Sequence, residues 1–187
     1  MAKYLLDTNA YFAILKYIVE EEHNSVMEAI VNSKCCISKL TQIEIISVIG
    51  QYARGKTGQR QVCDRIHEET GEPCGNIYVT QKRRKWSRQK VHDWLKLENE
   101  ISGGVNKRFR IEVLDVNEKV IEHAERFIQN ALIHNFGSMD AMILGTARAY
   151  SSENEEMIVV TADKALKAGM RRVGYPFVSI NINRKVF

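Results

Sequence analysis

The feature that most constrains this chain is the regular alternation of short apolar runs with longer stretches of helical periodicity. Strands that alternate with helices predict βαβ crossovers and a mainly parallel sheet covered by helices on both faces. We therefore expect an α/β protein with a sheet of about five strands. The runs that read as strands are residues 3–7, 35–38, 111–116, 157–163 and 177–181.

Polar residues indicate where the helices should begin and end. Asn9 is placed to cap a helix that begins near Ala10, and Gly55 follows a helical stretch over residues 40–53. The other stretches with helical spacing of apolar residues are 24–32, 88–101, 118–132, 139–150 and 164–169.

The length of 187 residues is about that of one domain, so we expect a single domain over residues 1–187. Residues 51–110 interrupt the alternation and carry 14 Lys and Arg against 7 Asp and Glu, a net charge of +7. The rest of the chain carries 13 basic and 16 acidic residues, a net charge of −3. We interpret residues 51–110 as a basic, helical insertion in a more acidic body.

Composition excludes several classes of protein. No apolar run approaches the roughly 18–20 residues that span a bilayer, so we expect a cytoplasmic protein without a membrane segment. Four cysteines in 187 residues are too few for a disulfide scaffold, so we expect reduced thiols. Cys63, His67, Cys74 and His92 lack the spacing of a zinc site.

Acidic residues lie where the carboxyl ends of the expected strands should meet. In parallel sheets, binding and catalytic residues lie beyond these strand ends. Asp7 closes the first strand, and Asp163 stands at the end of the strand run over 157–163. Glu44 lies in the first turn of the helix after the second strand, and Asp140 begins a helix after a Gly-Ser break. We expect these four carboxylates to converge at one edge of the sheet.

Each carboxylate also has a purely structural explanation. Glu44 can complete a capping box with Thr41, and Asp163 can cap the next helix. Asp140, at the expected second helical position, can favour the helix dipole, and Asp7 can be a turn residue. These explanations do not account for acidic residues at all four positions.

Four converging carboxylates repel one another unless a cation lies between them. Mg²⁺ or Mn²⁺, which prefer oxygen ligands, are the natural counter-ions, and such ions assist hydrolysis of phosphodiester bonds. The sequence contains no GxGxxG or Walker glycine loop and no signal of a nearby Ser/His/Asp triad. Metal-assisted hydrolysis of nucleic acid fits the pattern best.

The motifs around these acids resemble the PIN-domain nucleases, and in particular the VapC-like toxin ribonucleases of toxin–antitoxin modules. They follow the order of that family and reach both ends of the chain. The matching segments are LLDTNAY (5–11), SKLTQIEI (38–45), SMDAMILGTARAY (138–150) and IVVTADKAL (158–166).

The resemblance implies a PIN-like α/β/α sandwich that cleaves RNA with Mg²⁺ or Mn²⁺, often forms a homodimer, and is inhibited by a small antitoxin protein. It also implies that Thr161 and Asn9 support the site. The catalytic and metal-binding positions that the resemblance assigns are Asp7, Glu44, Asp140 and Asp163.

Other functions are compatible with the same pattern. The chain could be a PIN-fold nuclease that processes RNA or acts on DNA. It could also be a non-catalytic RNA-binding scaffold, although four unneutralised carboxylates gain nothing in binding phosphate.

A basic run in the expected insertion is a candidate grip for RNA, and its aromatic residue could stack a base. The alternatives are that the cations form a solvated helix face and that the aromatic residue packs the insertion onto the body. The residues of this candidate grip are Lys82, Arg83, Arg84, Lys85, Trp86 and Arg88.

Overall fold

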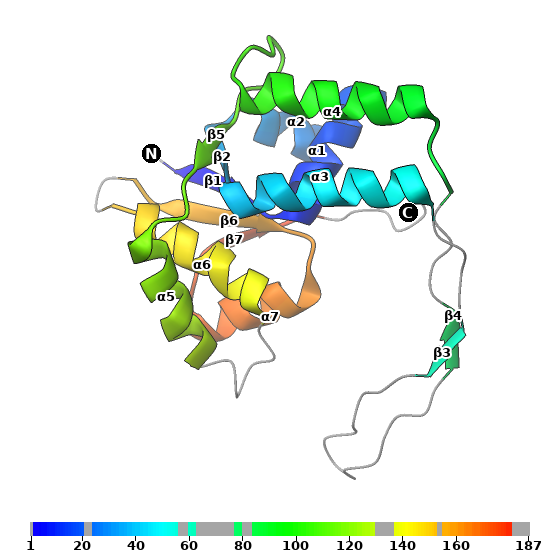
Figure 1. Cartoon of the computed structure of the whole chain (residues 1–187). Helices are drawn as coiled ribbons and strands as arrows, with labels where there is room; N and C mark the ends of the chain where they lie inside the picture. The colour runs from blue at the N-terminus through cyan, green and yellow to red at the C-terminus, as the bar shows by residue number, and fades with distance from the viewer. Residues whose placement is uncertain are drawn as a thin grey trace.

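The structure is a computed structural model, and it describes residues 2–20, 24–55, 60–62, 77–79, 84–129, 137–152 and 155–180. Its main sheet has five strands in the order β5-β2-β1-β6-β7, and every neighbouring pair is parallel. The expected parallel α/β architecture is therefore confirmed (Figure 1). The strands are β1 (Lys3–Leu6), β2 (Cys35–Ser38), β5 (Glu112–Leu114), β6 (Met157–Thr161) and β7 (Phe177–Ser179).

Helices connect these strands. Two further short strands, β3 (Arg60–Val62) and β4 (Ile77–Val79), pair with each other in antiparallel fashion. Among the described helices, none is long and apolar enough to cross a membrane. The helices are α1 (Thr8–Glu20), α2 (Ser25–Val31), α3 (Lys39–Arg54), α4 (Arg88–Ser102), α5 (Glu118–Gln129), α6 (Ser138–Tyr150) and α7 (Lys164–Val173).

The helices form two layers, one on each face of the sheet (Figure 1). Side chains of α1 to α4 form one core, which contains Leu6 and Cys35 of the sheet. Side chains of α6 and α7, with Phe127 of α5 against them, form the other core, which contains Leu5 and Cys36. Consecutive strand residues point to opposite faces, so each adjacent pair contributes to both cores. This arrangement is the expected α/β/α sandwich.

The first helix begins differently from the expectation. It starts at Thr8, and its cap is Asp7, whose Oδ1 accepts a hydrogen bond of 2.6 Å from the Ala10 backbone N–H. Asn9 therefore lies inside the first turn of α1 and is exposed, so the prediction that it caps the helix was wrong. An aspartate at this position satisfies a backbone donor that the helix itself cannot pair.

The starts of α3 and α6 also differ from the expectation. Ser38 is the cap of α3, because its Oγ accepts a 3.0 Å hydrogen bond from the Thr41 backbone N–H. Glu44 therefore lies in the second turn rather than the first, and the capping box with Thr41 was a wrong prediction. Gly137 precedes α6, so Asp140 is the third helical residue rather than the second.

The helical part of residues 51–110 packs against the rest of the molecule. Residues 51–54 are the last turn of α3, and α4 confirms the helix expected over 88–101. Trp94 and Ile101 of α4 are buried in the core that α1 and α3 share. Most of residues 56–83 lies outside the described ranges, including Cys63, His67 and Cys74, and an insertion there stays a prediction.

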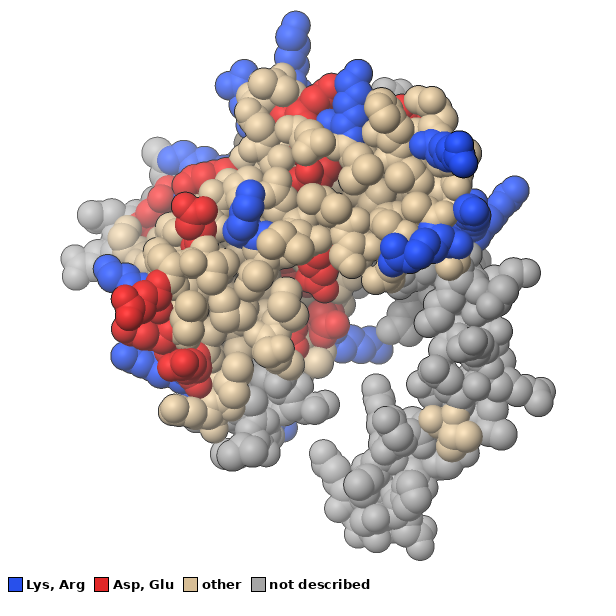
Figure 2. Space-filling model, viewed as in Figure 1, with Lys and Arg blue, Asp and Glu red and all other residues tan. Residues whose placement is uncertain are grey.

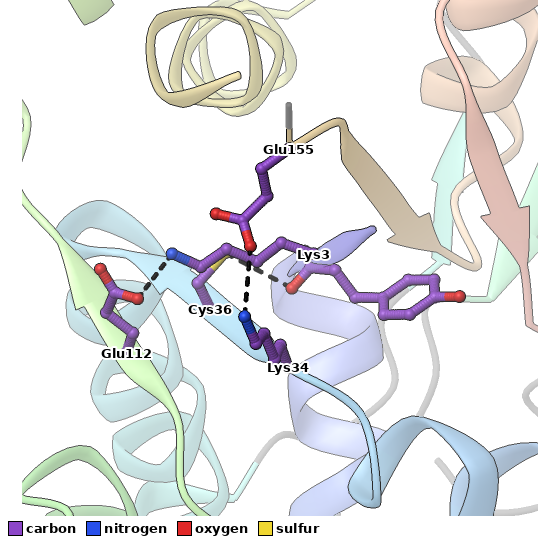
Figure 3. A network of polar contacts seen from close by, with 6 residues as sticks. Lys3, Lys34, Cys36, Glu112 and Glu155 are labelled. Atoms are coloured by element: carbon purple, nitrogen blue, oxygen red, sulfur yellow. Dashed lines mark hydrogen bonds and ion pairs between the residues drawn. The ribbon is translucent and has the colours of Figure 1, made fainter. Parts of the chain in front are cut away.

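The amino ends of the strands carry paired charges (Figure 3). Lys3 at the start of β1 forms a 2.5 Å ion pair with Glu112 at the start of β5. Lys34 and Glu155, which precede β2 and β6, pair at 3.5 Å. Opposite charges thus meet at this end of the sheet.

Candidate active site

The four predicted carboxylates lie at the opposite end, beyond the carboxyl ends of neighbouring strands. Asp7 follows β1 directly, and Asp163 lies two residues after β6. Glu44 lies on α3, which follows β2, and Asp140 lies in the first turn of α6. Figure 2 shows acidic side chains gathered between α3 and the starts of α6 and α7.

Asp7 is the most deeply buried of the four, with 5% of its surface exposed. Its Oδ1 accepts the hydrogen bond from the Ala10 N–H, and its Oδ2 accepts one from the Thr161 hydroxyl. Burial raises the pKa of Asp7 from its usual 3.8 to about 7 despite these two hydrogen bonds, and nearby Asp163 and Asp140 raise it further. The folded protein therefore holds this carboxylate at a cost that a bound cation would offset.

Thr161, the last residue of β6, connects two of the acidic residues. It is fully buried, and its Oγ1 donates to Asp7 while accepting a 2.9 Å hydrogen bond from the Asp163 backbone N–H. Asp163 in turn caps α7, because its Oδ1 accepts hydrogen bonds of 2.7 and 3.0 Å from the N–H groups of Ala165 and Leu166. One hydroxyl thus fixes the relative position of two carboxylates on adjacent strand ends.

Thr8 is a residue of the site that sequence reasoning missed. Its hydroxyl donates a hydrogen bond to Oε2 of Glu44, which joins the first turn of α1 to α3. The sequence feature that could have identified Thr8 is its position directly after Asp7, where α1 begins. Within the described part of the chain, the neighbouring Asn9 makes no hydrogen bond to any of the four carboxylates, so the structure does not bring it into the site.

Asp140 is electrostatically coupled to the other carboxylates. Burial raises its pKa, and the charges of Asp163 and Glu44 raise it further, although a 3.3 Å hydrogen bond from the Gly137 N–H opposes this. Since Asp140 and Asp163 also act on Asp7, the four carboxylates share one electrostatic environment. The four carboxylates thus lie at the same end of the sheet, as expected, and their role as a site stays a prediction.

The oxygen atoms of the site are of the type that binds divalent cations. No ion pair with Lys or Arg neutralises these carboxylates within the described ranges. Their carboxylate and hydroxyl oxygens are hard ligands, the type that Mg²⁺ and Mn²⁺ prefer. No three acidic, His or Cys side chains of the described residues are grouped closely enough to bind one ion directly. The oxygen donors fit a hard divalent cation.

The candidate RNA grip is only partly described. Arg84, Lys85 and Arg88 are exposed, whereas Lys82 and Arg83 lie outside the described residues. Trp86 stacks on Tyr52 of α3, with ring centroids 4.4 Å apart and planes at 16°. The Trp86 ring therefore packs this segment onto the body, as the alternative interpretation of the sequence proposed. It is not free to stack on a base.

Sequence comparison identifies the family of this chain. A family model of the PIN domain matches residues 4–169, and the chain belongs to the PIN domain family. PIN domains are generally nucleases. No curated protein matches the chain.

Solved structures share the fold. DNA-bound VapBC from Salmonella typhimurium is 20% identical, with a TM-score of 0.54 over 96% of this chain and 98% of that one. VapBC2 from Rickettsia felis, bound to a promoter DNA fragment, is 15% identical, with a TM-score of 0.54 over 96% and 99% of the two chains. FitAcB from Neisseria gonorrhoeae is 15% identical, with a TM-score of 0.50 over 94% and 96%. At these identities the likeness concerns the fold.

Proposed function

We propose that this protein is an endoribonuclease that depends on Mg²⁺ or Mn²⁺ and hydrolyses phosphodiester bonds at the acidic site. The observation that carries this proposal is the convergence of Asp7, Glu44, Asp140 and Asp163 at the carboxyl ends of adjacent strands. Membership of a family of nucleases supports it.

In this proposal the acidic residues have distinct roles. Asp7, Asp140 and Asp163 hold the divalent cation directly or through water, and Glu44 orients the attacking water. When bound, the cation supplies charge that stabilises the leaving oxygen and lowers the pKa of a bound water. Thr161 and Thr8 position Asp7 and Glu44 through the hydrogen bonds described above.

We further propose that the protein is the toxin of a toxin–antitoxin module and acts on cellular RNA in the cytoplasm. Its partners would be a small antitoxin protein and, in a homodimer, a second copy of the chain. The fold shared with VapBC and FitAcB structures supports this proposal.

The nuclease proposal is tested with purified protein on matched RNA and DNA substrates. Cleavage should require Mg²⁺ or Mn²⁺, stop in excess EDTA, favour RNA, and be lost in Asp140→Asn. Because Asp140→Asn keeps the volume of the side chain, circular dichroism should show an unchanged fold. Cleavage that persists in EDTA, or in Asp140→Asn, would contradict the proposal. Preference for DNA would instead assign the site to a DNA nuclease.

The toxin proposal is tested in a bacterial host. Induced expression should arrest growth, Glu44→Gln should relieve the arrest, and co-expression of the proposed small antitoxin should also relieve it. Sequencing of RNA ends after induction identifies the cleaved RNA. Normal growth with abundant soluble wild-type protein would count against a toxin but not against a nuclease.

A further inference from the structure

The basic segment of residues 84–90 lies against the far end of the helix that carries Glu44. The Trp86 backbone N–H donates a 3.0 Å hydrogen bond to the carbonyl of Tyr52, in the last turn of α3. Gly55, which ends α3 with a φ of 72°, approaches Lys85 so closely that an added Cβ would lie 3.0 Å from the Lys85 Cβ. The segment is thus placed by direct contact with the end of α3.

Aromatic stacking holds this segment in place. Trp86 lies between Tyr52 and Trp94, with centroid distances of 4.4 and 4.8 Å. Tyr52 and Trp94 in turn contact Phe12 of α1 at 5.7 and 5.1 Å. Rings from three helices thus fix the backbone of the segment to the body, and with it the points from which its cationic side chains extend.

The charge of the segment is uncompensated. Residues 84–90 contain four cationic and no acidic side chains, and Arg84, Lys85 and Arg88 are exposed. None of the four forms an ion pair within the described part of the chain. The fourth, Lys90, lies over the Trp86 ring at 4.8 Å from its centroid. Lys90 is exposed as well, and the three cations that do not lie over the ring are available to bind an anion.

The acidic site and the basic segment lie on the same face of the molecule. Figure 2 shows Lys and Arg side chains around the adjoining ends of α3 and α4, and acidic side chains beside the other half of α3. Ten residues separate Glu44 from Arg54 along α3, which corresponds to about 15 Å at 1.5 Å per residue. The two charged regions are thus held at a fixed separation by one helix.

We propose that Arg84, Lys85 and Arg88 form a phosphate-binding site, which holds single-stranded RNA about 15 Å from Glu44 along α3. This inference rests on the proposed nuclease function. An acidic metal site repels a polyanion at long range, and a fixed cationic site on the same face offsets that repulsion. A phosphate spacing of about 3.4 Å in a stacked strand makes this separation four to five nucleotides. The phosphate-binding site therefore selects substrates that extend at least that far on one side of the cleaved bond.

Binding is tested without cleavage, in the Asp140→Asn background, by fluorescence anisotropy of a labelled oligouridylate of about 16 nucleotides. The variant is Arg84→Ala/Lys85→Ala/Arg88→Ala. The control, Lys96→Ala/Lys107→Ala/Arg110→Ala, removes the same charge from the second half of α4 and the segment after it. Three lost phosphate contacts should flatten the slope of log affinity against log salt by about 2 units. Between about 50 and 200 mM salt, the affinity should then fall roughly 20-fold less than without the triple substitution.

Cleavage is tested with oligonucleotides from about 4 to about 16 nucleotides. The triple substitution should raise KM by a factor that grows with substrate length, with the largest change beyond about five nucleotides on one side of the cut. The control should show a smaller change without this length dependence. Equal salt slopes, or a change in KM that is independent of length, would overturn the inference.

Two other outcomes are distinguishable. If the triple variant loses only its binding to the small partner protein while RNA binding is unchanged, the segment is a protein-docking surface and the inference is wrong. If the oligonucleotide binds with the expected salt slope but no substrate is cleaved, the nuclease proposal fails while the phosphate-binding site stands.

Discussion

The Thr161 hydroxyl donates a hydrogen bond to the carboxylate of Asp7, from a position 154 residues further along the chain. The two residues meet because β1 and β6 are neighbours in the sheet and both end at the same edge. Thr161 is also the acceptor for the backbone of Asp163. A single side chain thus links two of the four acidic residues.

We expect Thr161→Val to lower cleavage at neutral pH by about 10- to 100-fold, as is typical for a partner of a metal ligand. The Thr161 hydrogen bond lowers the pKa of Asp7, so its loss raises that pKa and moves the acidic limb of the kcat/KM profile to higher pH. Thr161→Ser keeps the hydroxyl and should keep the wild-type profile. An unchanged profile in Thr161→Val would show that the hydrogen bond does not tune Asp7.

The buried Asp7 should make the metal-free protein less stable as pH rises. Its folded pKa of about 7 lies above the usual 3.8, so the folded state holds a proton that the unfolded state has lost. The resulting contribution to the free energy of unfolding is full below about pH 4 and is lost as pH rises through 7. That loss is up to about 4 kcal/mol, at 1.36 kcal/mol per pKa unit.

Chemical denaturation in EDTA at several pH values measures this effect. Asp7→Asn has no titrating carboxyl at this position, so the fall in stability between pH 4 and 7 should be smaller than in the wild type. Parallel pH dependences of the two proteins would contradict the assignment of this effect to Asp7.

Binding of Mg²⁺ or Mn²⁺ should stabilise the folded protein. At a concentration 100 times the dissociation constant, a ligand that binds only the folded state adds about 2.7 kcal/mol to the free energy of unfolding. The melting temperature should therefore rise with metal concentration in the wild type and rise less in Asp140→Asn. Equal shifts in both proteins would place the stabilising ion elsewhere.

Gly145 permits the close contact of α5 and α6. A Cβ added there would lie 2.5 Å from the Val120 carbonyl oxygen and 2.9 Å from the Ala124 Cβ. We expect Gly145→Ala to cost about 2 kcal/mol or more. Gly50→Ala is the matched control, because its Cβ would meet only the flexible end of Arg54, at 3.5 Å, and it should stabilise α3 by about 0.5–1 kcal/mol. Urea denaturation of both variants compares the two sites.

The Trp86 ring should contribute to stability as well as to RNA binding. Trp86→Leu removes the stacking on Tyr52 and should cost about 1–2 kcal/mol. It should also weaken oligouridylate binding, because the cations on either side lose their fixed position. Trp86→Phe keeps an aromatic face and should retain most of both properties. A loss of stability with unchanged RNA binding would show that the basic segment binds RNA without the stacking of Trp86.

The order of strands and helices was predictable because hydrophobic periodicity reports directly which side chains are buried. The residues that cap the helices were not predictable in the same way. Asp7 and Asn9 are both good caps, and only the observed start at Thr8 shows that Asp7 has that role. Similarly, Ser38 and Thr41 both read as helix starts, and Ser38 is the cap because β2 ends there.

The approach of the four acids was predictable from topology, since the carboxyl ends of parallel strands share one edge. The bond from Thr8 to Glu44 was not, because it depends on how α1 and α3 pack across the sheet. The packing of α4 into the core was also not predicted from the sequence. The basic composition of residues 51–110 favoured an insertion, whereas α4, which lies in that range, contributes Trp94 and Ile101 to the core.

Three of the four acids also hold their own helices in place: Asp7 caps α1, Asp163 caps α7, and Asp140 accepts the N–H of Gly137 before α6. Glu44 accepts a bond only from the Thr8 side chain among the described residues. A substitution that removes the side-chain oxygen therefore affects both the acidic site and a helix start at three positions, but only the acidic site at Glu44. In a population selected to lose a harmful activity while still making the protein, substitutions should accumulate at Glu44 first.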